Sequence, residues 1–131
     1  MRVIVQRYLL LFIGLTLVGI GLAYCIDPDL LLARYDLRAE GASADSMYRG
    51  AYGGLFVALG MAISCGFLLT TFRQTATLLA LLFMGGFALG RLASLLALGL
   101  PHPQIFSLLV FEVVTALACA WLLLTRPAAP G

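Results

Sequence analysis

The stretch Gly85–Ser94 reads GGFALGRLAS and places Arg91 in the middle of an apolar run. An arginine at the centre of a membrane-spanning helix costs about 2.5–3.5 kcal/mol on insertion scales. The guanidinium therefore needs a partner, which is an acid, a backbone carbonyl, water or a ligand. This one charge constrains the fold, because another part of the chain has to bring that partner to the same depth.

The composition is that of an integral membrane protein. Of the 131 residues, 63% are hydrophobic and 11% are charged, whereas about 25% of the residues of a soluble domain are charged. All the basic residues are arginines, and they form no cluster with interleaved aromatic residues. The sequence therefore lacks the basic pattern that is typical of nucleic-acid-binding proteins. Cys25, Cys65 and Cys119 have no paired spacing, and we interpret them as small apolar packing residues.

Four apolar runs each have about the 20 residues needed to cross a bilayer. They cover residues 8–26, 51–72, 75–100 and 105–125. Short connections between apolar helices favour antiparallel neighbours, so we predict an all-α, up-down four-helix transmembrane bundle. We expect residues 1–131 to form a single membrane domain.

The long connection 27–50 is expected to face outward, on the side of the membrane away from the cytoplasm. Asp27-Pro28 is typical of a helix start, and the leucines that follow predict a short helix lying at the membrane interface. Residues 40–46, EGASADS, are interpreted as a flexible polar link. By the positive-inside rule, both termini are expected to be cytoplasmic. That orientation rests on four arginines that fall on one side with no acid among them: Arg2, Arg7, Arg73 and Arg126.

Small residues recur at every fourth position of the second run. This ridge consists of Gly50, Gly54, Ala58, Ala62 and Gly66, and the third run has Gly86 and Gly90 at the same spacing. Small residues let helices approach closely in lipid, so we interpret both patterns as helix-packing faces. The spacing leaves open whether they pack within one chain or between chains.

Glu112 is the acid that matches Arg91 in depth. Arg91 lies ten residues before Pro101, which is about 15 Å along a helix, and Glu112 lies nine residues after Pro103, which is about 13–14 Å. We therefore expect an Arg91–Glu112 pair, with Arg49 joining from the outer end of the second run. Two interpretations stay open: a buried ion pair that fixes the register of two helices, and a polar site that binds a ligand.

Several of these residues together resemble a known family. The pieces RGAYGG at 49–54, Leu59-Gly60, GRLAS at 90–94, Gly99-x-Pro101 and Glu112 are similar to the pattern of the domain-of-unknown-function family numbered 4345. The resemblance implies a small four-helix protein of the bacterial inner membrane, with Arg49, Arg91 and Glu112 at the family's polar positions. It implies no activity. Leu98 departs from the pattern, because a polar residue is expected before Gly99.

The residues favour a non-catalytic function. The first hypothesis is a multi-pass protein whose Arg91/Glu112 site binds a lipid or small amphiphile, or fixes assembly with a membrane partner or a second copy. The alternative is a subunit of an oligomeric small-solute or proton-coupled transporter. An enzyme ranks last, because the chain offers no nucleophile, base and orienting group together. No motif for a metal or another cofactor occurs.

Overall fold

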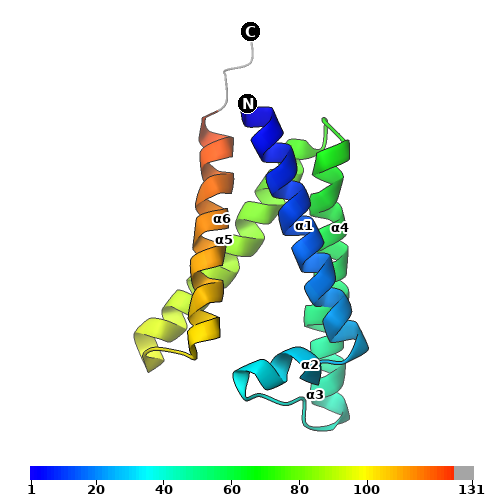
Figure 1. Cartoon of the computed structure of the whole chain (residues 1–131), viewed down its shortest axis with the longest axis vertical. Helices are drawn as coiled ribbons and strands as arrows, with labels where there is room; N and C mark the ends of the chain where they lie inside the picture. The colour runs from blue at the N-terminus through cyan, green and yellow to red at the C-terminus, as the bar shows by residue number, and fades with distance from the viewer. Residues whose placement is uncertain (126–131) are drawn as a thin grey trace.

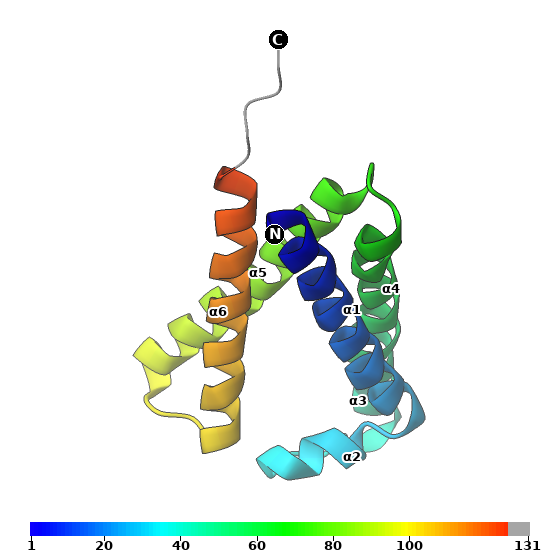
Figure 2. The ribbon, with the colours of Figure 1, turned by 45° about the horizontal axis from the view of Figure 1, so that its top comes forward.

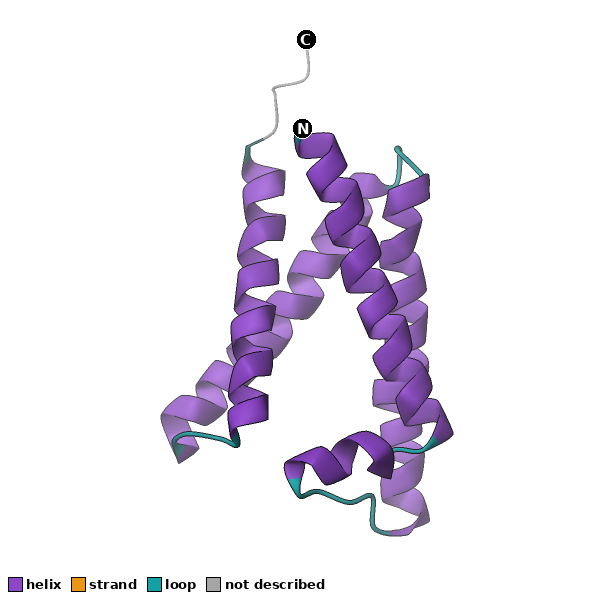
Figure 3. Cartoon of the chain, in the orientation of Figure 1, coloured by secondary structure: helices purple, strands orange, loops and turns teal. Residues whose placement is uncertain are grey.

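The structure is a computed structural model that describes residues 1–125, and these residues form helices joined by short loops (Figures 1 and 3). Four helical spans are long and apolar enough to cross a membrane. Three of them are α1 (Arg2–Ile26), α5 (Arg73–Leu98) and α6 (Pro103–Leu124). The fourth, Gly41–Leu68, is built from α3 (Gly41–Tyr48), a π-helical segment (Arg49–Gly54) and α4 (Leu55–Leu68). The all-α class and the four membrane-crossing lengths are therefore confirmed, while Arg126 lies outside the described residues.

The spans associate as two pairs. α1 packs along α4, and α5 packs along α6, while α5 also contacts α4 and crosses behind the other helices (Figure 1). The N-terminus, the α4–α5 turn and the end of α6 lie at one end of the molecule, which we call the terminal end (Figure 1). The short helix α2 (Asp29–Leu32) lies at the opposite end, the α2 end. Figure 2 shows α2 extending from the foot of α1 across the space towards α6.

The second span begins ten residues earlier than expected. Residues 40–46 are not a flexible link, because α3 begins at Gly41 and continues through the π-helical segment into α4. Gly41 has φ of +84°, which sets the turn before the helix. No proline follows before Leu68 to interrupt the backbone hydrogen bonds, so the helix runs on beyond the apolar stretch. The other boundaries also differ: α1 starts six residues earlier than expected, α5 covers 73–98 and α6 covers 103–124.

The expected short helix in the long connection is present. The Asp27 carboxylate accepts a hydrogen bond from the backbone N–H of Asp29 at 3.0 Å, as a helix cap does. α2 then continues as a 3₁₀ turn over Ala33–Tyr35. Pro28 and Leu32 are buried against the rest of the molecule, whereas Leu30 is exposed. This segment therefore covers the α2 end with one apolar face turned inward.

The close packing of α1 on α4 depends on glycines that the fourth-position pattern missed. A Cβ at Gly60 would lie 2.6 Å from the carbonyl oxygen of Gly14, and a Cβ at Gly21 would lie 2.8 Å from that of Gly53. Each helix thus contributes two glycines seven residues apart. Backbones can approach this closely only where side chains are absent.

The predicted ridge is therefore wrong as a packing face within one chain. Among the described residues, a Cβ at Gly50, Gly86 or Gly90 would meet no atom within 4 Å, and at Gly54 it would meet only the carbonyl oxygen of Arg49 at 3.9 Å. Ala58 is exposed and Ala62 is half-buried. Gly66 alone is in close contact, since its Cβ would lie 2.6 Å from Ala76. The i+4 pattern identified one of the packing glycines and missed the rest.

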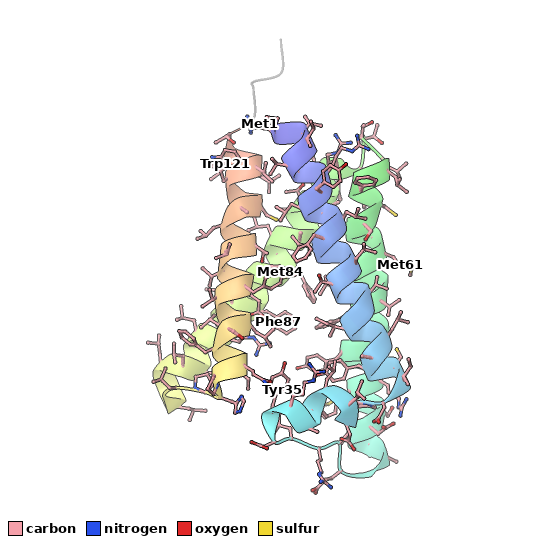
Figure 4. The ribbon with its side chains drawn as sticks, in the orientation of Figure 1. Met1, Tyr35, Met61, Met84, Phe87 and Trp121 are labelled. Atoms are coloured by element: carbon pink, nitrogen blue, oxygen red, sulfur yellow. The ribbon has the colours of Figure 1, made fainter. Side chains whose placement is uncertain are left out.

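Arginines tie the helix ends together at the terminal end. Arg7 Nε donates to the carbonyl oxygen of Phe67 at 3.2 Å, and Arg73 Nε donates to that of Gly66 at 3.1 Å. These carbonyls end α4, where a positive charge is favourable. Arg2 donates to Thr125 at 2.5 Å and lies over the ring of Trp121. Figure 4 shows Met1 and Trp121 at this same end of the molecule. The buried hydrophobic core consists of Leu10, Ile13, Leu17, Phe56, Ile63, Ala76, Ala80, Met84 and Cys119.

Candidate functional site: a cavity with an intramembrane arginine

Arg91 on α5 and Glu112 on α6 are in direct contact. Arg91 Nε lies 3.0 Å from Oε1 and 2.9 Å from Oε2 of Glu112. The Glu112 side chain is 8% exposed, and that of Arg91 is 28% exposed. The short turn at 99–102 brings the two helices back alongside each other, which sets the two residues at the same level. The carboxylate is thus buried with its charge compensated, and Arg91 reaches further out.

The pair uses only one edge of the guanidinium. Both hydrogen bonds that Arg91 makes within residues 1–125 start from Nε, so neither Nη group donates to an acceptor there. The guanidinium carbon lies 5.8 Å from the centre of the Phe87 ring, one turn earlier on α5. An arginine carries five N–H donors in a planar fork. Arg91 therefore retains its Nη donors for another acceptor.

Arg91 lines a cavity of about 410 Å³ that lies between the two helix pairs. Figure 4 shows Met84 and Phe87 projecting into the space between α1 and α6, with Tyr35 beyond them at the α2 end. Every span contributes to the wall, and α2 with its 3₁₀ turn closes one end. Its lining residues are Thr16, Leu17, Ile20, Tyr24, Leu31, Leu32, Arg34, Tyr35, Leu37, Tyr48, Tyr52, Phe56, Phe83, Met84, Phe87, Arg91, Ile105, Leu108, Phe111 and Glu112.

Aromatic side chains form one wall of the cavity. The rings of Tyr24 and Tyr52 lie 5.4 Å apart between centroids, and that of Tyr52 lies 5.5 Å from Phe56. Phe56 in turn contacts Phe87 edge-on at 5.7 Å, which carries the row of rings to Arg91. Such separations are those of attractive ring pairs. The wall is therefore a continuous row of packed aromatic rings.

Arg49 does not join the Arg91–Glu112 pair. Its Nε donates to Asp45 Oδ2 at 2.7 Å, one helical turn earlier, and its Nη1 donates to the carbonyl oxygens of Cys25 and Ile26. The expectation that Arg49 completes the site is thus wrong, because the end of α1 holds its side chain. Arg49 instead ties the π-helical segment to the C-terminal carbonyls of α1, where a cation is favourable.

The second arginine of the cavity is Arg34, which the sequence did not single out. It lies on the 3₁₀ turn, and both it and Tyr35 line the end of the cavity. Nothing in the sequence fixes how this connection folds back over the helices, so the position of Arg34 could not be derived from spacing. The tyrosines carried a signal: Tyr48 and Tyr52 are four residues apart and therefore share a helix face.

Comparison with known proteins gives one match. The model of the family DUF4345, a domain of unknown function, matches residues 5–123. No curated protein and no solved structure matches the chain. Because the family model covers most of the sequence, the chain belongs to the DUF4345 family.

Proposed function

We propose that this member of the DUF4345 family is a non-catalytic protein of the bacterial inner membrane that binds one anionic lipid or amphiphile in its cavity. One observation carries the proposal: Arg91 lines a mainly aromatic and aliphatic cavity, and its Nη groups donate to no acceptor within residues 1–125. An apolar pocket with a few convergent polar groups is the usual form of a small-molecule site. Its polar group here is fixed in place by Glu112.

The charges of the lining favour an anionic head group. Two arginines, Arg34 and Arg91, and one acid, Glu112, line the cavity, which leaves one positive charge in excess. A carboxylate or phosphate can accept two parallel hydrogen bonds from the free edge of the Arg91 guanidinium. Binding such a group in a site of low dielectric would compensate the excess charge and satisfy the donors together.

The Arg91–Glu112 pair also fixes the packing of α5 on α6, and this structural role is compatible with ligand binding. A pair that only fixed the register of α5 and α6 would need no open space beside it. Arg91 instead has Glu112 on one side and the cavity on the other. The carboxylate holds the guanidinium in one orientation, so a ligand meets donors that are already positioned.

The orientation in the membrane completes the proposal. Arg2, Arg7 and Arg73 lie at the terminal end with no acid among them, whereas the three arginines of the long connection lie at the α2 end among its five acids. By the positive-inside rule, we propose that both termini are cytoplasmic and that the α2 end faces outward. The Arg91–Glu112 pair would face the outer leaflet. Labelling single cysteines at Ser43 and Gln74 from one side of intact cells, in a background without the native cysteines, tests this orientation.

The test of binding is native mass spectrometry of the protein released from a mild detergent. We expect wild type to carry a molecule at a one-to-one ratio, and the double variant Arg91→Gln/Glu112→Gln to lose it. The double variant removes both charges together, so no unpaired ion is left in the membrane. Arg38→Gln is the matched control, because Arg38 is exposed and lies outside the cavity lining.

Three results would contradict the proposal. If the wild-type protein carries no stoichiometric ligand, the cavity does not bind an amphiphile as proposed. A ligand retained equally by wild type and by the double variant would place the binding site away from Arg91. Loss of the ligand from the Arg38→Gln control would mean that surface charge, and not the cavity, determines binding.

A further inference from the structure

A second hollow lies on the outside of α5, and we call it the α5 groove. It has a volume of about 560 Å³ and is lined by Tyr52, Leu82, Phe83, Gly86, Phe87, Gly90, Arg91 and Ser94. Its floor is smooth, because a Cβ added at Gly86 or Gly90 would meet no atom within 4 Å. The groove is therefore a shallow trough along the helix, open on the side that would face lipid.

The groove and the cavity share part of their walls. Tyr52, Phe83 and Phe87 line both hollows, and so does Arg91. The three rings thus form the partition between the interior and the lipid-facing side. Phe83 and Phe87 lie 4.9 Å apart between centroids, and Tyr52 reaches them through Phe56. A partition made of side chains can open by rotamer changes, without movement of a helix.

The length and direction of the groove match those of a lipid chain. From Arg91 to Leu82 the groove follows nine residues of α5, which is about 13–14 Å along a helix. Half of the hydrocarbon core of a bilayer is about 15 Å thick. Arg91 lies about 10 Å from the end of α5 at Leu98, and Leu82, about 24 Å from that end, lies just beyond the middle of the helix. A head group at Arg91 would thus have its chain directed towards the bilayer centre, as lipids of the same leaflet do.

We infer that the α5 groove holds the hydrocarbon chain of the amphiphile whose anionic head is bound by Arg91, so that the site is loaded sideways from the bilayer. This inference rests on the proposed function and adds the position of the chain and the route of entry. The head lies in the cavity beside Arg91, and the chain passes the rings of Tyr52 and Phe87 into the groove. The ligand class is a long-chain carboxylate or phosphate monoester.

Photolabelling in vesicles tests the position of the chain. The probe is a long-chain fatty acid with a diazirine at its chain end, added to the full chain in phosphatidylethanolamine–phosphatidylglycerol vesicles. We expect adducts on Leu82, Phe83 and Gly86 that disappear when excess unlabelled fatty acid is added. A second probe with the same chain and a phosphate monoester head identifies which head group is preferred.

Variants that fill the groove provide the second readout. Gly86→Leu and Gly90→Leu add side chains where no atom is in the way, so the fold is expected to persist. Both should abolish labelling in the groove. Gly19→Leu is the matched control, because it is the same change at another open glycine, on α1 and outside both linings, and it should label like wild type.

The outcomes separate this inference from the proposed function. Saturable adducts confined to interior residues such as Leu17 and Leu108 would overturn the groove and leave binding in the cavity intact. The absence of saturable adducts with either probe would contradict the proposed function itself. If Gly86→Leu or Gly90→Leu changes the oligomeric mass in native mass spectrometry, the groove joins two copies of the chain and the inference is overturned.

Discussion

Arg91 Nε lies 3.0 Å and 2.9 Å from the two carboxylate oxygens of Glu112, so a single N–H edge of the guanidinium holds the whole carboxylate. This arrangement satisfies the acid, which is 8% exposed, and leaves the opposite edge of the arginine unused. Because the two residues lie on helices that pack side by side, the contact fixes the register of α5 on α6. The same contact holds Arg91 in the wall of the cavity, and its Nη groups donate to no acceptor within residues 1–125.

Reversal of the pair should separate its two roles. Arg91→Glu and Glu112→Arg each bring two like charges together in a nearly buried place, and each should lower stability by about 3–5 kcal/mol. The double reversal restores opposite charges and should recover much of the expression and thermal stability lost in either single variant. It should not recover binding of an anionic amphiphile, because the group that reaches the cavity from α5 would then be an acid.

Expression and melting temperature in detergent measure how far the pair supports the fold. Native mass spectrometry measures whether the amphiphile is still bound. Single reversals that are as stable as wild type would show that the contact does not support the fold. A double reversal that regains both the ligand and stability would show that ligand binding does not require the guanidinium to come from position 91 on α5.

The packing of α1 on α4 gives a prediction with a control on the same helix. Gly14→Ala places a Cβ 2.6 Å from the carbonyl oxygen of Gly60 and should destabilise the protein by about 1–3 kcal/mol, as overpacking does. Gly19→Ala adds the same methyl group where no atom lies within 4 Å, so it should be neutral or slightly stabilising. Thermal unfolding of both variants in one detergent checks the difference, and equal melting temperatures would contradict the close approach.

Depth along a helix could be read from the sequence, and the contacting face of a helix could not. The Arg91–Glu112 contact follows from counting residues on either side of one short turn, because the helical rise is constant and neighbouring helices are antiparallel. The packing face depends on how two helices cross. Positions four residues apart turn by about 40° at each step, so the line from Gly50 to Gly66 turns by about 160° around the helix. This turn explains why Gly50 is exposed and Gly66 is buried.

The glycines that do pack are seven residues apart, and this spacing drifts by only about 20°. Gly14 and Gly21 on α1 meet Gly60 and Gly53 on α4 and its π-helical start. The sequence contained this signal, but the i+4 pattern in the same span concealed it. The cavity had no comparable signal, because it depends on where α2 folds and on the bulk of rings from four spans.

Arg49 should support the fold and not the ligand. It joins Asp45 to the last carbonyls of α1, so Arg49→Ala should lower the melting temperature and loosen the π-helical segment. Arg49→Lys should retain part of the stability, because an ammonium can reach a carbonyl but lacks the fork that bridges three acceptors. Ligand occupancy in native mass spectrometry should stay within about twofold of wild type, since rim contacts away from the bound group contribute little.

Arg38→Ala is the control for Arg49, because Arg38 is exposed and donates no side-chain hydrogen bond among the described residues. It should leave both the melting temperature and ligand occupancy unchanged. Complete loss of the ligand in Arg49→Ala, with the melting temperature preserved, would place Arg49 in the binding site after all.

Variants of helix α2 can distinguish two routes by which the amphiphile enters the cavity. One route leads from water past α2, and the other leads from the lipid through the α5 groove. Leu32 is 3% exposed and holds α2 against the molecule, whereas Leu30 on the same short helix is 58% exposed. Leu32→Ala removes buried packing worth about 2 kcal/mol or more, so the amides of residues 30–32 should exchange hydrogen roughly thirtyfold faster, and Leu30→Ala should not change them. If the amphiphile enters through the α5 groove, its dissociation rate should be unchanged in Leu30→Ala. In Leu32→Ala it should rise by much less than thirtyfold, because only the contact with Leu32 in the cavity wall is lost. A dissociation rate that rises with hydrogen exchange in Leu32→Ala alone would mean that α2 is the gate, because the ligand would then leave by the end of the cavity that this helix covers.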